Sequence, residues 1–276
     1  MMRRLLIGIV LVACALPVLL IGALWSGQEK MIFPGPPVSE DEVRQRAARA
    51  GASLLHISTP DGERLLAWHE DRGTDAAILY FHGNGSICDR PPKHRRILEA
   101  RDISFVCIAY RGYPGSTGEP SEDGLHVDAL AAYHWVTQEL GIDPSRVLVH
   151  GRSLGGGVAA RLASRVSVAG VVLESTFRSV RRVAEGAYPG LPVQPLLRHP
   201  FDTESIADDL SMPTLVLHGD LDRVIDVSHG RWLGAHIPSA QYVEAPGHDH
   251  NSGLLTEHPA SREAYERFLD EHIGPR

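Results

Sequence analysis

The stretch that decides the fold of this chain reads Gly151-Arg152-Ser153-Leu154-Gly155, with two further glycines directly behind it. A short β-branched segment, 146–150, predicts a strand before it, and 158–163 suits a helix after it. A G-x-S-x-G sequence between a strand and a helix predicts a nucleophile elbow, a sharp turn that lifts the serine hydroxyl above a sheet. The glycines are needed because backbone approaches backbone there without room for Cβ atoms. Ser153 is therefore a candidate nucleophile at a helix start, where free N–H groups favour negative charge.

Composition indicates an ordinary globular chain with a core. Of its 276 residues, 43% are hydrophobic and 22% are charged, which suits one large α/β domain. The net charge of −7, without a dense basic block, gives no reason to expect a nucleic acid as a partner. The three cysteines, Cys14, Cys88 and Cys107, are too few for a disulfide framework and indicate no redox compartment.

The N-terminus predicts a membrane segment. Residues 5–25 carry no charged side chain, and as a helix they would extend about 31 Å, enough to cross a bilayer core. A retained signal anchor is favoured over a cleaved signal peptide, and over a lipoprotein signal at the lipobox-like 11–14. Arg3 and Arg4, against only Lys30 beyond the apolar run, predict a single-pass protein with a cytoplasmic N-terminus. The domain that follows is then expected on the outer, periplasmic or extracytoplasmic side.

The remainder reads as one domain, 28–276, after an anchor or signal segment, 1–27. Its expected strands are 54–58, 64–68, 76–81, 104–109, 146–150, 168–173, 214–218 and 241–244. The first two flank a turn and predict a hairpin, and the others alternate with helical segments. This alternation predicts a mainly parallel, doubly wound sheet with helices on both faces. About forty residues separate the strands ending at Leu173 and starting at Thr214, enough for a short flap but not a large cap.

A serine nucleophile needs a base, and its two candidates follow the last expected strand. Gly247-His248-Asp249-His250 comes after the last strand, and we expect His248 to be the base because it follows a glycine at the strand end; His250 is the rival. No third metal ligand with suitable spacing accompanies the two histidines, so a metal site is not expected.

The base in turn needs a carboxylate that orients it. The segment after the penultimate strand, 218–225, carries Asp222, which its position on the loop makes the expected acid. Asp220, Asp226 and Glu174 are the alternatives, in that order. The chain order of serine, aspartate and histidine matches that of α/β-hydrolases.

Attack on a carbonyl also needs two N–H groups aimed at the oxyanion. We expect the first from the backbone of Leu154. The second is assigned to the backbone of Asn84, because the adjacent Gly83 and Gly85 allow close approach after the strand 76–81. A glycosylation sequon or a plain turn is the alternative interpretation of residues 84–86.

These motifs resemble the α/β-hydrolase family, and within it the membrane-anchored serine hydrolases related to monoacylglycerol lipases and protein depalmitoylases. The resemblance spans about residues 28–273 and rests on the segments 81–85, 110–118, 151–156, 174–177, 218–222 and 247–249. It implies hydrolysis of esters or thioesters through an acyl-serine, carried by Ser153, Asp222 and His248 without a cofactor. The chain departs from the family pattern at Asp226, where proline is common, and in having His250.

The hypothesis is thus a serine hydrolase of small esters or acylated molecules, with lipid-like substrates favoured by the N-terminal segment. The same residues would also suit a serine peptidase acting on short peptides. A non-catalytic, membrane-tethered binding module on a hydrolase scaffold is the alternative from another class.

Overall fold

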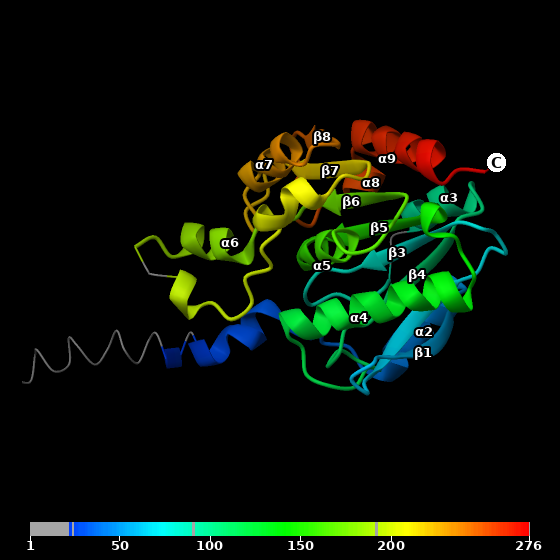
Figure 1. The fold of residues 1–276 in the computed structure, drawn as a ribbon, viewed down its shortest axis with the longest axis horizontal. Coiled ribbons are helices and arrows are strands. Elements are labelled where there is room, and N and C mark those ends of the chain that lie inside the picture. The colour runs from blue at the N-terminus through cyan, green and yellow to red at the C-terminus, as the bar shows by residue number, and fades with distance from the viewer. Residues whose placement is uncertain (1–21, 24, 90–91, 191–192, 276) are drawn as a thin grey trace, which may run out of the picture.

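The apolar segments expected to be strands form one eight-stranded sheet in the computed structural model, which describes residues 22–23, 25–89, 92–190 and 193–275 (Figure 1). The strands are β1 Ser53–Ser58, β2 Arg64–Glu70, β3 Ala77–Phe81, β4 Ser104–Ile108, β5 Val147–Arg152, β6 Gly170–Glu174, β7 Thr214–Gly219 and β8 Ala240–Ala245. Their order across the sheet is β1-β2-β4-β3-β5-β6-β7-β8.

Pairing within the sheet follows the expected pattern. β1 and β2 form an antiparallel hairpin, and β2 pairs antiparallel with β4. From β4 through β3 to β8 all neighbours are parallel. The central strands are buried along their whole length because helices cover both faces. The predicted α/β-hydrolase fold, with a mainly parallel sheet, is therefore confirmed.

Helices lie on both faces of the sheet. Their bounds are α2 Glu40–Ala50, α3 Pro92–Glu99, α4 Glu122–His134, α5 Leu154–Ala163, α6 Val180–Ala187, α7 Ser228–His236, α8 Leu254–Glu257 and α9 Pro259–His272. Two consecutive residues of β5 show which helices cover each face of the sheet. The ring of His150 packs against Tyr265 of α9 and His94 of α3, whereas the backbone of Gly151 lies against Ala159 of α5. Because successive strand residues point to opposite faces, α5 covers the face opposite α3 and α9.

A flap of residues 175–213 connects β6 to β7 and carries α6. In Figure 1 it projects from the sheet beside the helical residues 25–32 near the N-terminus. The side chain of Gln28 joins the two segments: its Nε2 donates to Leu196 O at 3.1 Å and its Oε1 accepts from Arg198 N at 2.7 Å. The expected boundary between residues 27 and 28 thus falls inside a helix that packs on the flap.

The expected single-pass membrane placement is not supported. Within the described ranges, no helix combines the length and apolar character needed to cross a membrane. This finding overturns the placement with an outer catalytic domain for the part of the chain that the structure describes. The apolar run 5–25 itself lies almost wholly outside the described residues, which begin at 22 and omit 24.

The structure also contains one disulfide that the sequence does not predict. Cys88 and Cys107 form a disulfide, with their Cα atoms 5.7 Å apart. Cys107 lies near the end of β4, and the loop that leaves the adjacent β3 brings Cys88 back over it. Three cysteines are too few for a framework but enough for one bridge, and only the adjacency of β3 and β4 decides which two meet.

Candidate active site

Ser153 stands on a strained turn between β5 and α5. Its backbone has φ 53° and ψ −120°, a region that residues with a side chain rarely adopt. The surrounding glycines make the turn possible: a Cβ atom on Gly151 would lie 2.2 Å from Gly155 O, and one on Gly155 would lie 2.0 Å from Phe81 O. The elbow therefore has the geometry that the G-x-S-x-G motif predicts, and the helix begins directly after the serine.

Three side chains from three strand ends form one hydrogen-bonded chain at the elbow. Ser153 Oγ lies 3.1 Å from His250 Nε2, and His250 Nδ1 lies 2.7 Å from Asp222 Oδ2. With Nδ1–H donating to the carboxylate, Nε2 is free to accept the serine proton. All three residues are buried. This arrangement can activate a serine hydroxyl as a nucleophile.

The structure corrects the histidine expected in this chain. His248 closes the turn after β8, and its Nδ1–H donates to Pro246 O at 2.8 Å, whereas the ring that contacts Ser153 Oγ is that of His250. Its backbone is held by the loop after β7, because Leu221 N donates to His248 O at 3.0 Å. The histidine that reaches Ser153 comes two residues after His248, at His250. In the part of the chain that the structure describes, no group of three or more His, Cys, Asp or Glu side chains is arranged to hold a metal ion.

The carboxylate of Asp222 is fully engaged. Its Oδ1 accepts from the backbone N–H groups of Val224 and Ile225, at 2.9 and 2.8 Å, and its Oδ2 also lies 3.3 Å from His218 Nε2. Burial acts to raise the pKa of this carboxyl, but the hydrogen bonds from His218, His250 and Ile225 outweigh it and hold the pKa well below its usual range. Asp222 therefore stays ionised opposite His250.

The other carboxylates considered from the sequence serve different contacts. Asp220 accepts from Gly247 N at 2.6 Å, and Asp226 accepts from Ser228 N at the start of α7 at 2.9 Å. Glu174 accepts from His150 Nε2 at 3.0 Å on the face of the sheet that α9 covers. None of these three carboxylates is hydrogen-bonded to His250, whose Nδ1 lies against Asp222.

The loop after β3 lies directly against the elbow. A Cβ atom on Gly83 would lie 3.3 Å from Ser153 Cβ and 3.8 Å from its Oγ. The next residue, Asn84, lines the cavity above the serine together with Leu154. Among the described residues, no backbone hydrogen bond occupies the N–H of Asn84 or of Leu154. Asn84, Leu154 and Ser153 thus line the same cavity.

One contact at the site was not expected from the sequence. Arg152, the variable residue of the motif next to Ser153, donates through Nη2 to His250 O at 2.6 Å. Its Nε lies 3.8 Å from Glu174 Oε1. The guanidinium thus connects the elbow to the main chain of the histidine loop. The sequence carries no signal for this contact, since the two residues lie 98 positions apart.

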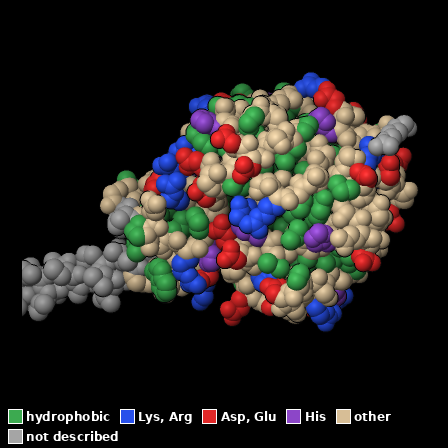
Figure 2. Space-filling view, in the orientation of Figure 1, with side chains coloured by type: hydrophobic (Ala, Val, Ile, Leu, Met, Phe, Trp, Pro, Cys, Tyr) green, Lys and Arg blue, Asp and Glu red, His purple; other side chains and the backbone are tan. Residues whose placement is uncertain are grey.

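A cavity of about 340 Å³ opens above Ser153. Its walls are apolar and come from three segments: the helical residues 25–32, α6 with the rest of the flap, and the loop at Val224 and Ile225. Several of its wall residues also reach the surface, among them Trp25, Met31 and Tyr188. In Figure 2 hydrophobic side chains gather at the end of the molecule where α6 projects. The site therefore combines a polar reacting centre with an apolar binding space.

Comparison with known proteins identifies similar sequences. A family profile described as α/β hydrolase fold matches residues 78–185. An uncharacterized protein of Mycobacterium tuberculosis is 34% identical over 273 residues, covering 93% of this chain and 95% of that protein. The α/β-hydrolase domain-containing protein WAV2 of Arabidopsis thaliana is 31% identical over 227 residues, covering 73% of each chain.

Among solved structures, the esterase Pf2001 of Pyrococcus furiosus superposes with a TM-score of 0.68 at 19% identity. The match covers 81% of this chain and 93% of that one. At this level of identity the likeness shows a shared fold.

Proposed function

This chain belongs to the α/β-hydrolase family, and on that premise we propose that it is a serine hydrolase of carboxylic esters, thioesters included, with an apolar acyl group. The observation that carries the proposal is the buried chain Ser153–His250–Asp222 beneath an apolar cavity. The nucleophile, the base and the binding space meet at one point.

The reaction follows from these positions. Ser153 Oγ attacks the carbonyl carbon of the ester while His250 Nε2 takes the hydroxyl proton, and Asp222 stabilises the imidazolium that forms. The negative charge on the carbonyl oxygen is stabilised by the N–H groups of Asn84 and Leu154. When the tetrahedral intermediate collapses, the bond to the leaving oxygen or sulfur breaks and His250 returns the proton to it. The acyl group remains on Ser153 until a water, deprotonated by His250, releases it as a carboxylic acid.

The cavity supports the choice of acyl group. Ser153 and Leu154 line it, and so do aliphatic side chains of α6, including Val180 and Val183. Burying an alkyl chain there gains about 0.8 kcal/mol per methylene group. An acyl chain bonded to Ser153 can therefore lie along α6, whereas a charged acyl group would lose its hydration without a partner.

The test is covalent labelling by a fluorophosphonate, followed by mass spectrometry. We expect one label on the wild-type protein and none on Ser153→Ala. The matched control is Ser164→Ala, which removes a serine hydroxyl from the other end of α5 and leaves labelling intact. Absence of label on folded wild-type protein would overturn the proposed mechanism. A series of p-nitrophenyl esters then tests the acyl preference: kcat/KM should rise from acetate towards medium chains.

A further inference from the structure

The loop that carries Asn84 is tied to the rest of the fold at three points around that residue. It has no regular secondary structure between the end of β3 and residue 89. Before Asn84, the hydroxyl of Tyr110 donates to His82 O at 2.8 Å. Directly after it, Gly85 N donates to Pro34 O at 2.9 Å. Further on, Cys88 is bonded to Cys107.

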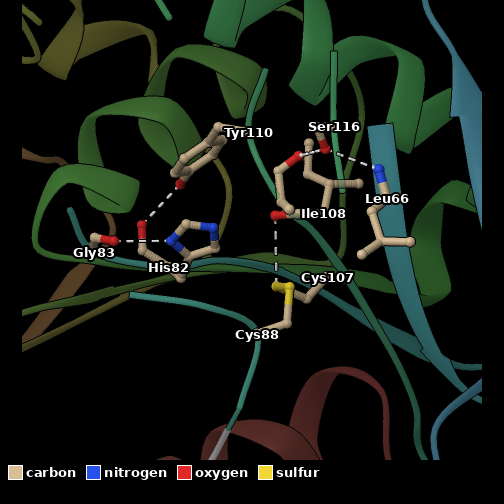
Figure 3. Close-up of a disulfide and its surroundings, with 9 residues drawn as sticks. Leu66, His82, Gly83, Cys88, Cys107, Ile108, Tyr110 and Ser116 are labelled. Carbon is tan, nitrogen blue, oxygen red and sulfur yellow. Dashed lines mark hydrogen bonds between the residues drawn. A yellow bond between two sulfur atoms is a disulfide. The ribbon is translucent and has the colours of Figure 1, made fainter. Parts of the chain in front are cut away.

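Two of these ties lead to the same strand. Cys107 lies on β4, and Tyr110 follows the end of that strand by two residues (Figure 3). β4 is itself held on both sides, since Cys107 pairs with Trp68 of β2 and with Tyr80 of β3. Just beyond the strand, Ser116 donates to Ala109 O at 2.7 Å and accepts from Leu66 N at 2.9 Å. The loop is thus anchored to a rigid part of the sheet.

The contacts at the Tyr110 end are protected from water. His82 and Tyr110 are buried, with ring centroids 4.3 Å apart. Burial raises the pKa of the Tyr110 phenol well above its ordinary value, so the hydroxyl keeps the proton that it donates to His82 O. Both sulfur-bearing residues are buried as well. Neither tie competes with solvent.

From this arrangement we infer that the Cys88–Cys107 disulfide and Tyr110 are positioning residues, which hold the N–H of Asn84 at the place where the oxyanion forms. The inference rests on the proposed function. An oxyanion donor stabilises the transition state only if it is aimed before the charge develops, and a displacement of about 1 Å can cost roughly 100-fold in rate. A loop without regular structure does not provide such precision by itself. This loop gains that precision because one of its ends is hydrogen-bonded to Tyr110 and the other is covalently bonded to Cys107, both at the same strand.

The test compares three variants with the wild type on a p-nitrophenyl ester. Cys88→Ala/Cys107→Ala removes the covalent tie and Tyr110→Phe removes the hydrogen bond to His82. Tyr133→Phe is the matched control, because the Tyr133 hydroxyl donates to Ser167 O at the same 2.8 Å, far from the loop. The readouts are kcat, KM, the thermal midpoint, and the affinity for a trifluoromethyl ketone, which forms a tetrahedral adduct on a nucleophilic serine.

We expect kcat to fall about 10- to 100-fold in the disulfide variant and in Tyr110→Phe, with KM changed less than about twofold. Affinity for the trifluoromethyl ketone should fall in parallel, and Tyr133→Phe should keep both values whatever its thermal midpoint. Unchanged kcat in both loop variants, or an equal loss in Tyr133→Phe, would overturn the inference. Should the disulfide variant not fold, Tyr110→Phe decides alone. Fluorophosphonate labelling of the wild type distinguishes failure of this inference from failure of the serine mechanism: a labelled wild type with unchanged kcat in the loop variants contradicts only the inference.

Discussion

His250 Nε2 lies 3.1 Å from Ser153 Oγ although 97 residues separate the two in the chain. Two residues earlier, His248 turns its ring to the carbonyl of Pro246 instead. A single tight turn after β8 therefore decides which of two neighbouring histidines faces the serine. Four predictions follow from the site and its surroundings.

The first prediction separates the two histidines. His250→Ala removes the group that accepts the serine proton, so kcat on a p-nitrophenyl ester should fall at least about 1,000-fold. His248→Ala removes a partly exposed ring and should leave kcat within about threefold of the wild type. Circular dichroism checks that both variants are folded. A larger loss in His248→Ala than in His250→Ala would contradict the assignment.

The second concerns the carboxylate. Asp222→Asn keeps the shape of the side chain but puts an amide opposite His250 Nδ1, which favours the wrong tautomer, so kcat should fall about 10⁴-fold. The same exchange at Asp226, whose carboxylate accepts from Ser228 N at the start of α7, should change kcat less than about threefold. Equal losses in the two variants would show that Asp222 does not orient the base.

The third concerns the apolar cavity. Ala184→Trp places a large ring where α6 lines the cavity, so the ratio of kcat/KM for octanoate to that for butyrate should drop roughly 10-fold or more. Gly186→Trp on the same helix is the control, because a side chain there meets open space. An unchanged ratio in Ala184→Trp would mean that the acyl chain binds elsewhere.

The fourth concerns stability and pH. Burial raises the pKa of Glu122 to about 7, with a hydrogen bond from Phe201 N opposing the rise. Between the ordinary value of 4.5 and about 7 the native state holds this proton while the unfolded state releases it. The native state then binds more protons, so the free energy of unfolding falls as pH rises through this range.

Glu122→Gln keeps the acceptor for Phe201 N but does not titrate. It should raise the free energy of unfolding at pH 8 by about 1–3 kcal/mol and flatten its change between pH 5 and 7. Urea unfolding at several pH values measures this. Glu119→Gln, at a nearby exposed glutamate, is the control, and an identical pH profile in all three proteins would contradict the prediction.

Much of the fold could be predicted because its signals are local. The continuous apolar segments of β3 and β4 indicate strands buried on both faces, and the turn 59–62 indicates the β1–β2 hairpin. The order of β4 and β3 within the sheet, and therefore the Cys88–Cys107 bridge, could not be predicted, because pairing depends on how helices pack over the whole sheet.

The candidate site divides in the same way. The glycines that flank Ser153 predict its strained backbone, since a Cβ atom at either position would clash with the main chain. The position of Asp222 follows from the loop after β7. The sequence favours His248 over His250 because position at the strand end is its only guide, and the direction of a ring after a tight turn is not encoded in spacing.

By itself, the amino-acid sequence determined the strands, the elbow and the side-chain types at three strand ends, because glycine requirements and hydrophobic patterning act over a few residues. Only the tertiary structure decided what depends on distant segments meeting: the histidine that faces Ser153, the contact of Arg152 with its main chain, and the disulfide beside Asn84. The wall that residues 25–32 add to the cavity belongs to the same class. These features arise when chain segments far apart in sequence pack together, and the spacing of residues along the chain does not predict that packing.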